Sequence, residues 1–280
     1  MAGSAHRLTS LAVPPTRKES DMSSSPVSQL LEDAHAEGVL SPTSLQALTT
    51  VDLGAQIQAG LGISVDDVQS SEVVLVTVMP DDSGSMASHA RTVCEGHNLV
   101  LDALLASQQK DGVLFHTRYL NGFVLNPFRP LEDVVRMHDK NYDPDQGTPL
   151  YDQAVVLLGT VLAKAQEFTR NGVSARTVTL LITDGADAHS QRARAREVAA
   201  LVEDLRRAEN HIVAGMGIDD GSTDFRKVFR SMGIEDKWIL TPGHNAQDIR
   251  KAFQVFSQSA VRVSQGAATF HPSALGGFGA

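Results

Sequence analysis

Short apolar runs alternate with segments of helical periodicity through most of the chain, and this alternation restricts the choice of fold more than any other feature. The run Val73 to Met79 is continuous and rich in valine, as in a strand buried on both faces, and Val178 to Ile182 and Ile212 to Gly217 resemble it. Apolar residues at helical spacing predict helices from Leu150 to about Phe168 and near Arg194 to Ala208. Strands that alternate with amphipathic helices are typical of an α/β fold with a parallel sheet.

Turn signals and shorter apolar runs predict the rest of the sheet. Asn121-Gly122 separates the segments Gly112 to Leu120 and Gly122 to Pro127, which we expect to form a hairpin with an antiparallel edge strand. Trp238 to Leu240 adds a short strand, and Ile249 to Ala260 marks the closing helix. We therefore expect a doubly wound, Rossmann-like α/β fold with six strands, mostly parallel with one antiparallel edge strand, and helices on both faces.

The two ends of the chain differ from this middle part. A leader rich in Ser, Pro and Ala is expected to be disordered, and a tail rich in Gly and Ala is expected to be flexible unless Phe270 or Phe278 docks. Between the leader and the sheet, a short helical extension carries leucines such as Leu31 and Leu48. These leucines either pack on the main domain or form a surface that binds a partner, and we favour packing on the domain. Translation starts at Met1 or at Met22. The predicted parts are a leader, an extension, an α/β domain and a tail, at residues 1–25, 26–69, 70–264 and 265–280.

Charge and composition exclude several classes of partner. The net charge of −9 disfavours a broad phosphate-binding face, so we expect no nucleic-acid partner. The longest strongly apolar run is far shorter than the ~20 residues that span a bilayer, so we expect no membrane segment. Cys94 is the single cysteine and lies among core positions of a predicted helix, which excludes an intramolecular disulfide and suits the cytoplasm.

Oxygen-bearing side chains gather in three loops that follow or precede predicted elements. Asp81, Ser83 and Ser85 follow the first core strand, Thr148 precedes a helix, and Asp184 ends a later strand. In open parallel sheets such positions meet at the carboxyl edge, where ligands bind. Carboxylates and hydroxyls suit a hard cation such as Mg²⁺, and this set leaves a coordination position for an outside ligand. Helix capping explains any one of these residues, but not all five together.

This pattern resembles the metal-ion-dependent adhesion site (MIDAS) of von Willebrand factor type A (VWA) domains, and the resemblance covers roughly residues 70 to 262. It implies that Ser83 and Ser85 ligate the cation directly, Thr148 directly or through water, and the two aspartates mostly through water. Mg²⁺ is the expected ion, and Mn²⁺ or Ca²⁺ can replace it. Pro80 departs from the family pattern, in which the apolar strand usually continues at this position. Because proline has no backbone N–H to donate to the neighbouring strand, we expect it to bend the strand end.

Two other patterns near the site carry less weight. Asp82 is expected at a solvated rim rather than in the ligand set. His89, Cys94 and His97 share one predicted helix, but histidines eight residues apart do not converge on one zinc ion without further ligands. We expect these histidines at the surface or in the core.

The leading hypothesis is a non-enzymatic module that binds an Asp or Glu of a protein partner through the open cation position. Intracellular bacterial VWA proteins, which this chain resembles, often accompany AAA+ ATPases or stress and defence assemblies. One alternative is a Mg²⁺-dependent phosphotransfer enzyme that uses Asp81 as phosphoryl acceptor. However, Ser83 stands where haloacid-dehalogenase-like phosphatases place an aspartate. Another alternative is a purely structural subunit whose extension and tail make the contacts.

Overall fold

The sheet has six strands in the order β3-β2-β1-β4-β5-β6. We describe it in a computed structural model that covers residues 26–49, 53–265 and 277–279. All neighbouring strands are parallel except β2 and β3, which form the antiparallel edge hairpin, so the predicted fold class is confirmed. The strands are β1 Glu72–Pro80, β2 Val113–Arg118, β3 Val124–Pro130, β4 Ser174–Thr183, β5 His211–Gly217 and β6 Ile239–Leu240.

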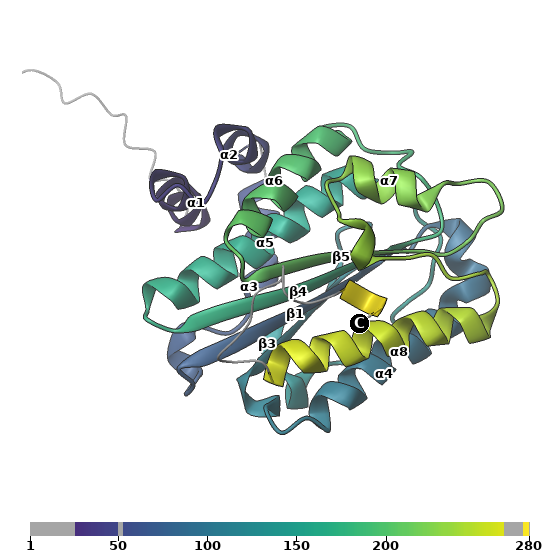
Figure 1. The fold of residues 1–280 in the computed structure, drawn as a ribbon, viewed down its shortest axis with the longest axis horizontal. Coiled ribbons are helices and arrows are strands. Elements are labelled where there is room, and N and C mark those ends of the chain that lie inside the picture. Colours follow the sequence, from purple (N-terminus) through teal and green to yellow (C-terminus); the bar gives the residue numbers. More distant parts are fainter. Residues whose placement is uncertain (1–25, 50–52, 266–276, 280) are drawn as a thin grey trace, which may run out of the picture.

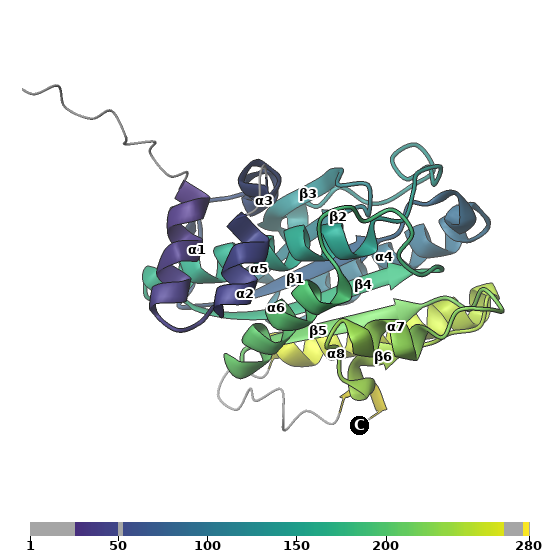
Figure 2. The ribbon, with the colours of Figure 1, turned by 90° about the horizontal axis from the view of Figure 1, so that it is seen from above.

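Helices cover both faces of this sheet (Figures 1 and 2). Helices α4 and α8 pack against each other on one face, whereas α3, α5 and α6 cover the other. The helices are α1 Pro26–Ala36, α2 Pro42–Thr49, α3 Leu53–Leu61, α4 Ala90–Leu105, α5 Leu150–Arg170, α6 Ala195–Arg207, α7 Phe225–Ser231 and α8 Ala246–Gln265. None of the helices in the described parts of the chain is long and apolar enough to cross a membrane.

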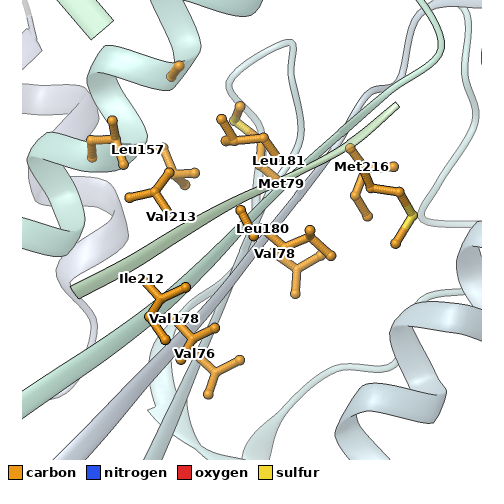
Figure 3. Packing of buried hydrophobic residues seen from close by; sticks show 14 of the residues in the cluster. Val76, Val78, Met79, Leu157, Val178, Leu180, Leu181, Ile212, Val213 and Met216 are labelled. Atoms are coloured by element: carbon orange, nitrogen blue, oxygen red, sulfur yellow. The ribbon is translucent and has the colours of Figure 1, made fainter. Parts of the chain in front are cut away.

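The central strands are buried on both faces, which explains their uninterrupted apolar sequences. Figure 3 shows Val76 and Val78 of β1 beside Val178 and Leu180 of β4. Every residue from Val73 to Pro80 is buried. The apolar runs therefore fill two helix–sheet interfaces at once, and this burial is the main force that stabilises the domain.

Helices α4 and α8 pack closely at a point where α4 contains a glycine. A Cβ atom built on Gly96 would lie only 2.1 Å from the Phe253 ring of α8. The Phe253 side chain is fully buried against the bare backbone at this point. The two helices thus depend on the absence of a side chain at Gly96.

The N-terminal extension packs on the sheet domain, as the favoured interpretation of its leucines predicted. Leu31, Leu48 and Ile57 are buried in the main core, and α3 lies against α5 and β3. The guanidinium of Arg118, which is 1% exposed, donates hydrogen bonds to the Gln56 carbonyl of α3 and to a carbonyl of the β2–β3 turn. The extension therefore shares one core with the strands.

The predicted leader lies outside the described residues, and so does most of the tail. Within the described part of the tail, Phe278 packs edge-on against Trp238, with ring centroids 5.3 Å apart, and its centroid lies 6.4 Å from that of Phe256. The tail end at Phe278 is therefore docked on the domain.

Candidate metal centre

The Asp81 carboxylate lies at the carboxyl end of β1 and is fully buried. Its Oδ1 accepts a 2.7 Å hydrogen bond from the Ser83 N–H, and its Oδ2 accepts a 2.6 Å bond from the Thr183 hydroxyl. Burial raises the pKa of Asp81, whereas these hydrogen bonds oppose the shift. Strand β1 and its neighbour β4 thus hold this carboxylate in one orientation.

A chain of hydrogen bonds joins the two serines to the second carboxylate. The Ser85 hydroxyl donates a 2.7 Å bond to Asp184 Oδ1, and the Ser83 and Ser85 hydroxyl oxygens are 3.1 Å apart. Since Ser85 gives its proton to Asp184, Ser83 is the donor to Ser85. Burial also raises the pKa of Asp184. Four of the five predicted residues are therefore linked by side-chain contacts at one edge of the sheet.

Backbone hydrogen bonds bring the Thr148 loop to the same edge. Ser83 forms a parallel bridge with Gln146, whose N–H donates a 3.0 Å bond to the Asp82 carbonyl. The Thr148 N–H donates a 2.8 Å bond to Nδ1 of His189, and the Thr148 carbonyl accepts a 3.2 Å bond from the His189 N–H. The loops that carry Ser83, Thr148 and Asp184 are thus joined, and ligation by the Thr148 hydroxyl remains a prediction.

The chemistry of these donors fits a hard cation. Both Asp81 oxygens already accept hydrogen bonds, which suits a carboxylate that reaches a cation through water. The Ser85 proton is directed at Asp184, so its oxygen has a lone pair left for a cation besides the one that accepts from Ser83. Across the described residues no three His, Cys, Asp or Glu side chains cluster in metal-binding geometry, so a cation here would depend on the hydroxyls. Such an oxygen-only set suits Mg²⁺ better than Zn²⁺.

Three residues that support the site were not singled out from the sequence. Thr183 orients Asp81, His189 holds the Thr148 loop, and the Tyr142 hydroxyl donates to the Asp81 carbonyl. Thr183 could have been found from the sequence, because it directly precedes Asp184 at the end of the predicted strand. Tyr142 and His189 lie in loops without periodicity, so only the folded chain reveals their partners.

No family model and no curated protein matches this sequence. In three dimensions the chain is similar to solved structures that include a VWA domain. Proximal thread matrix protein 1 from the mussel byssus is 16% identical, with a TM-score of 0.47, over 68% of this chain and 48% of that chain. The SpRpn10 VWA domain is 10% identical, with a TM-score of 0.47, over 68% of this chain and 96% of that one.

Two of the similar structures were solved with a metal ion. One is a second structure of the mussel protein, with a zinc-occupied MIDAS motif, at 15% identity and a TM-score of 0.44 over 69% of this chain and 47% of that one. The other is the manganese-loaded TRAP protein of Plasmodium vivax, at 17% identity and a TM-score of 0.42 over 66% of this chain and 74% of that one. The chain spans less than half of the mussel protein, and at these identities the likeness concerns the fold alone.

The expectation that Asp82 lies at a solvated rim is wrong. Asp82 is 2% exposed, and its Oδ1 accepts a 2.9 Å hydrogen bond from the Asn121 N–H. Burial raises the pKa of Asp82 to about 6. The residue caps the β2–β3 turn, a tertiary contact that the motif spacing does not reveal.

The strand pairing continues through Pro80, the residue expected to bend the strand end. Pro80 pairs with Ile182 as the last residue of β1, and the following Asp81 N–H donates a 2.8 Å bond to the Ile182 carbonyl. The Pro80 carbonyl accepts a 3.2 Å bond from Leu120. These bonds on both sides hold the strand end although proline lacks a donor.

The helix that follows the site holds core residues, as the sequence suggested. His97 is fully buried, and its Nε2 lies 2.9 Å from the Thr117 hydroxyl. Cys94 is a free, buried thiol whose pKa is raised by burial to about 11, so it is a poor nucleophile.

Proposed function

We propose that the chain binds a divalent cation, Mg²⁺ in the first place, and uses it to bind an Asp or Glu carboxylate of a protein partner. The observation that carries the proposal is the hydrogen-bonded chain from Ser83 through Ser85 to Asp184, beside the buried carboxylate of Asp81. The residues proposed to hold the cation are Asp81, Ser83, Ser85, Thr148 and Asp184.

The two buried aspartates support a divalent cation, which can take an outside carboxylate as a further ligand. Two aspartates bring at most two negative charges, and both are buried where the charged form is disfavoured without a cation. A bound divalent cation would supply the compensating charge and an electrophilic position for one further oxygen ligand. The chain's own residues orient the set: Thr183 fixes Asp81, and Asp184 fixes Ser85.

We propose a cytoplasmic protein that acts inside a larger assembly, with an AAA+ ATPase as one candidate partner. Its net charge of −9 supports a protein partner over a nucleic acid. The single cysteine is in keeping with a reducing compartment. An assembly partner would be found by its cation-dependent attachment.

The phosphotransfer alternative finds less support. A phosphoryl acceptor must reach its substrate, yet Asp81 is fully buried and both of its oxygens accept hydrogen bonds. The residue two positions later is Ser83, which cannot act as a carboxylic general acid. A binding role therefore explains the same residues without an accessible Asp81 or a carboxylic acid at position 83.

The test is affinity purification of the full chain in Mg²⁺ and in a chelator, followed by the same experiment with the Ser83→Ala/Ser85→Ala variant. We expect a set of proteins that is retained only by the native chain and only with the cation. A partner that is retained equally in chelator and by the double variant would favour a purely structural subunit instead.

A further inference from the structure

The surface beside the candidate metal centre carries an exposed aromatic side chain, Phe123. It is 54% exposed and Val135 is 43% exposed, and they are the exposed large hydrophobic side chains of the described residues. Exposed aromatic side chains that are held in place are frequent anchors of protein interfaces. Phe123 therefore needs an explanation that the cation site does not give.

Phe123 lies on a turn that is bonded directly to the metal-site loop. The Asn121 N–H donates to Asp82, the residue between Asp81 and Ser83. The turn is closed by a 2.8 Å bond from the Tyr119 N–H to the Phe123 carbonyl and by a 2.6 Å bond from the Phe123 N–H to Asn121 Oδ1. Because the turn is fixed, the chain loses little additional conformational freedom when a partner covers Phe123.

Three aromatic rings connect this surface to the site. The Phe123 ring lies 5.7 Å from the Tyr119 ring, and the Tyr119 ring lies 5.3 Å from the Tyr142 ring, measured between centroids. The Tyr142 hydroxyl in turn donates to the Asp81 carbonyl. Tyr119 and Tyr142 are 3% and 2% exposed, so Phe123 is the only exposed ring of these three. One rigid unit thus presents both the candidate cation position and the exposed ring.

The charges around the site indicate which charge a bound partner segment must have besides its carboxylate. The loops 81–89, 119–123 and 138–148 contain five aspartates and a single lysine. Asp143 and Asp145 are exposed, and Asp145 directly precedes Gln146, which pairs with Ser83. A divalent cation offsets only part of this negative charge, so a purely acidic segment would be repelled.

We infer that Phe123 is a second contact for the same partner, and that the recognised segment carries an apolar side chain and a Lys or Arg next to its carboxylate. This inference rests on the proposed function and specifies its partner. The carboxylate fills the cation position, the apolar side chain covers Phe123, and the basic residue faces the exposed aspartates.

The experiment uses the full chain and synthetic peptides of defined composition. Each peptide carries one Glu, a neighbouring position is Leu, Phe or Ser, and the flanks are Lys or Ser. Binding is measured by biolayer interferometry in Mg²⁺ and in EDTA, and Mn²⁺ binding is measured separately by calorimetry. The variants are Phe123→Ala and, as a matched control on another exposed apolar side chain, Val135→Ala.

We expect Mg²⁺-dependent binding that is strongest for peptides with both an apolar and a basic neighbour. Phe123→Ala should weaken the binding of these peptides at least tenfold, to the level of the Ser-substituted peptides, with unchanged Mn²⁺ affinity. Val135→Ala should change the affinity for these peptides less than twofold. Mg²⁺-dependent binding that is indifferent to the apolar neighbour or to Phe123→Ala would overturn the inference and leave the proposed function standing. An absence of Mn²⁺ binding, or peptide binding that EDTA does not alter, would overturn both.

Discussion

The hydroxyl of Ser85 donates a 2.7 Å hydrogen bond to Asp184, which lies 99 residues further along the chain. This contact joins the loop after β1 to the end of β4, and it directs the serine proton away from the position where a cation would sit. The bond therefore gives a direct test of the site, because a change at Ser85 affects the cation but hardly the apolar core.

The Ser83→Ala/Ser85→Ala variant should lose cation binding and remain folded. In the native chain, Mg²⁺ at 100 times its Kd should add about 2.7 kcal/mol to the free energy of unfolding, and this gain should vanish in the variant. Calorimetry and thermal melts with and without Mg²⁺ measure both effects. Ser88→Ala, at an exposed serine of the 3-10 helix Gly84–His89 that also contains Ser85, is the control and should bind the cation normally. Unfolding of the double variant would count against the assignment.

Thr183→Val should destabilise the chain, because it leaves the buried Asp81 carboxylate without one of its donors. We expect a loss of about 1–3 kcal/mol in the free energy of unfolding. Thr179→Val on the same strand is the control, since the buried Thr179 hydroxyl has no hydrogen-bond partner in the described structure. It should leave the stability unchanged or raise it. Urea unfolding of both variants measures the difference, and equal losses would contradict the role given to Thr183.

Stability should fall as the pH is lowered from 7 to 5, because buried histidines must stay neutral in the folded chain. Burial lowers the pKa of His97 to about 4, and of His116 and His211 to about 3, from 6.5. Below pH 6.5 the unfolded chain therefore binds more protons than the folded one, which favours unfolding.

Each of these histidines should contribute about 2 kcal/mol to the loss between pH 7 and pH 5, at 1.36 kcal/mol per pH unit below about 6.5. His116→Leu isolates one contribution, since neither ring nitrogen of His116 has a hydrogen-bond partner among the described residues. Denaturant unfolding at pH 7, 6 and 5 should show a shallower dependence for this variant. An unchanged slope would mean that His116 titrates normally.

Gly96→Ala should destabilise the chain although alanine favours helices. The added methyl group would overlap the Phe253 ring, so α4 and α8 must move apart. We expect a loss of about 1–3 kcal/mol. The double variant Gly96→Ala/Phe253→Leu should recover part of it, and thermal melts of the single and double variants measure the recovery. A single variant as stable as the native chain would show that the helices can separate without cost.

The fold was predictable from the sequence because its signals are local. Buried parallel strands are continuous apolar runs, and Asn121-Gly122 marks the one hairpin. The observed strands β1, β4 and β5 contain the predicted runs, with ends that differ by a few residues. The hairpin differs most, since β3 begins at Val124 and ends at Pro130.

The candidate site was predictable only in its outline. The order of Asp81, Ser83, Ser85 and Asp184 marks the loop positions, and the fold brings them together. The burial of Asp82 was missed, because the Asn121 N–H that it accepts belongs to a distant turn. Periodicity locates elements, but it does not show which polar groups meet across loops.

Arg118 makes the helices before the sheet more than a covering layer. Its guanidinium is buried, and no carboxylate in the described structure forms an ion pair with it. One of its donors is satisfied by the Gln56 carbonyl of α3. A chain shortened to begin at residue 70 would remove this acceptor and expose the apolar surfaces of α5 and β3 on which α3 packs. We expect such a fragment to aggregate, so the smallest piece suitable for expression or fusion begins before α3.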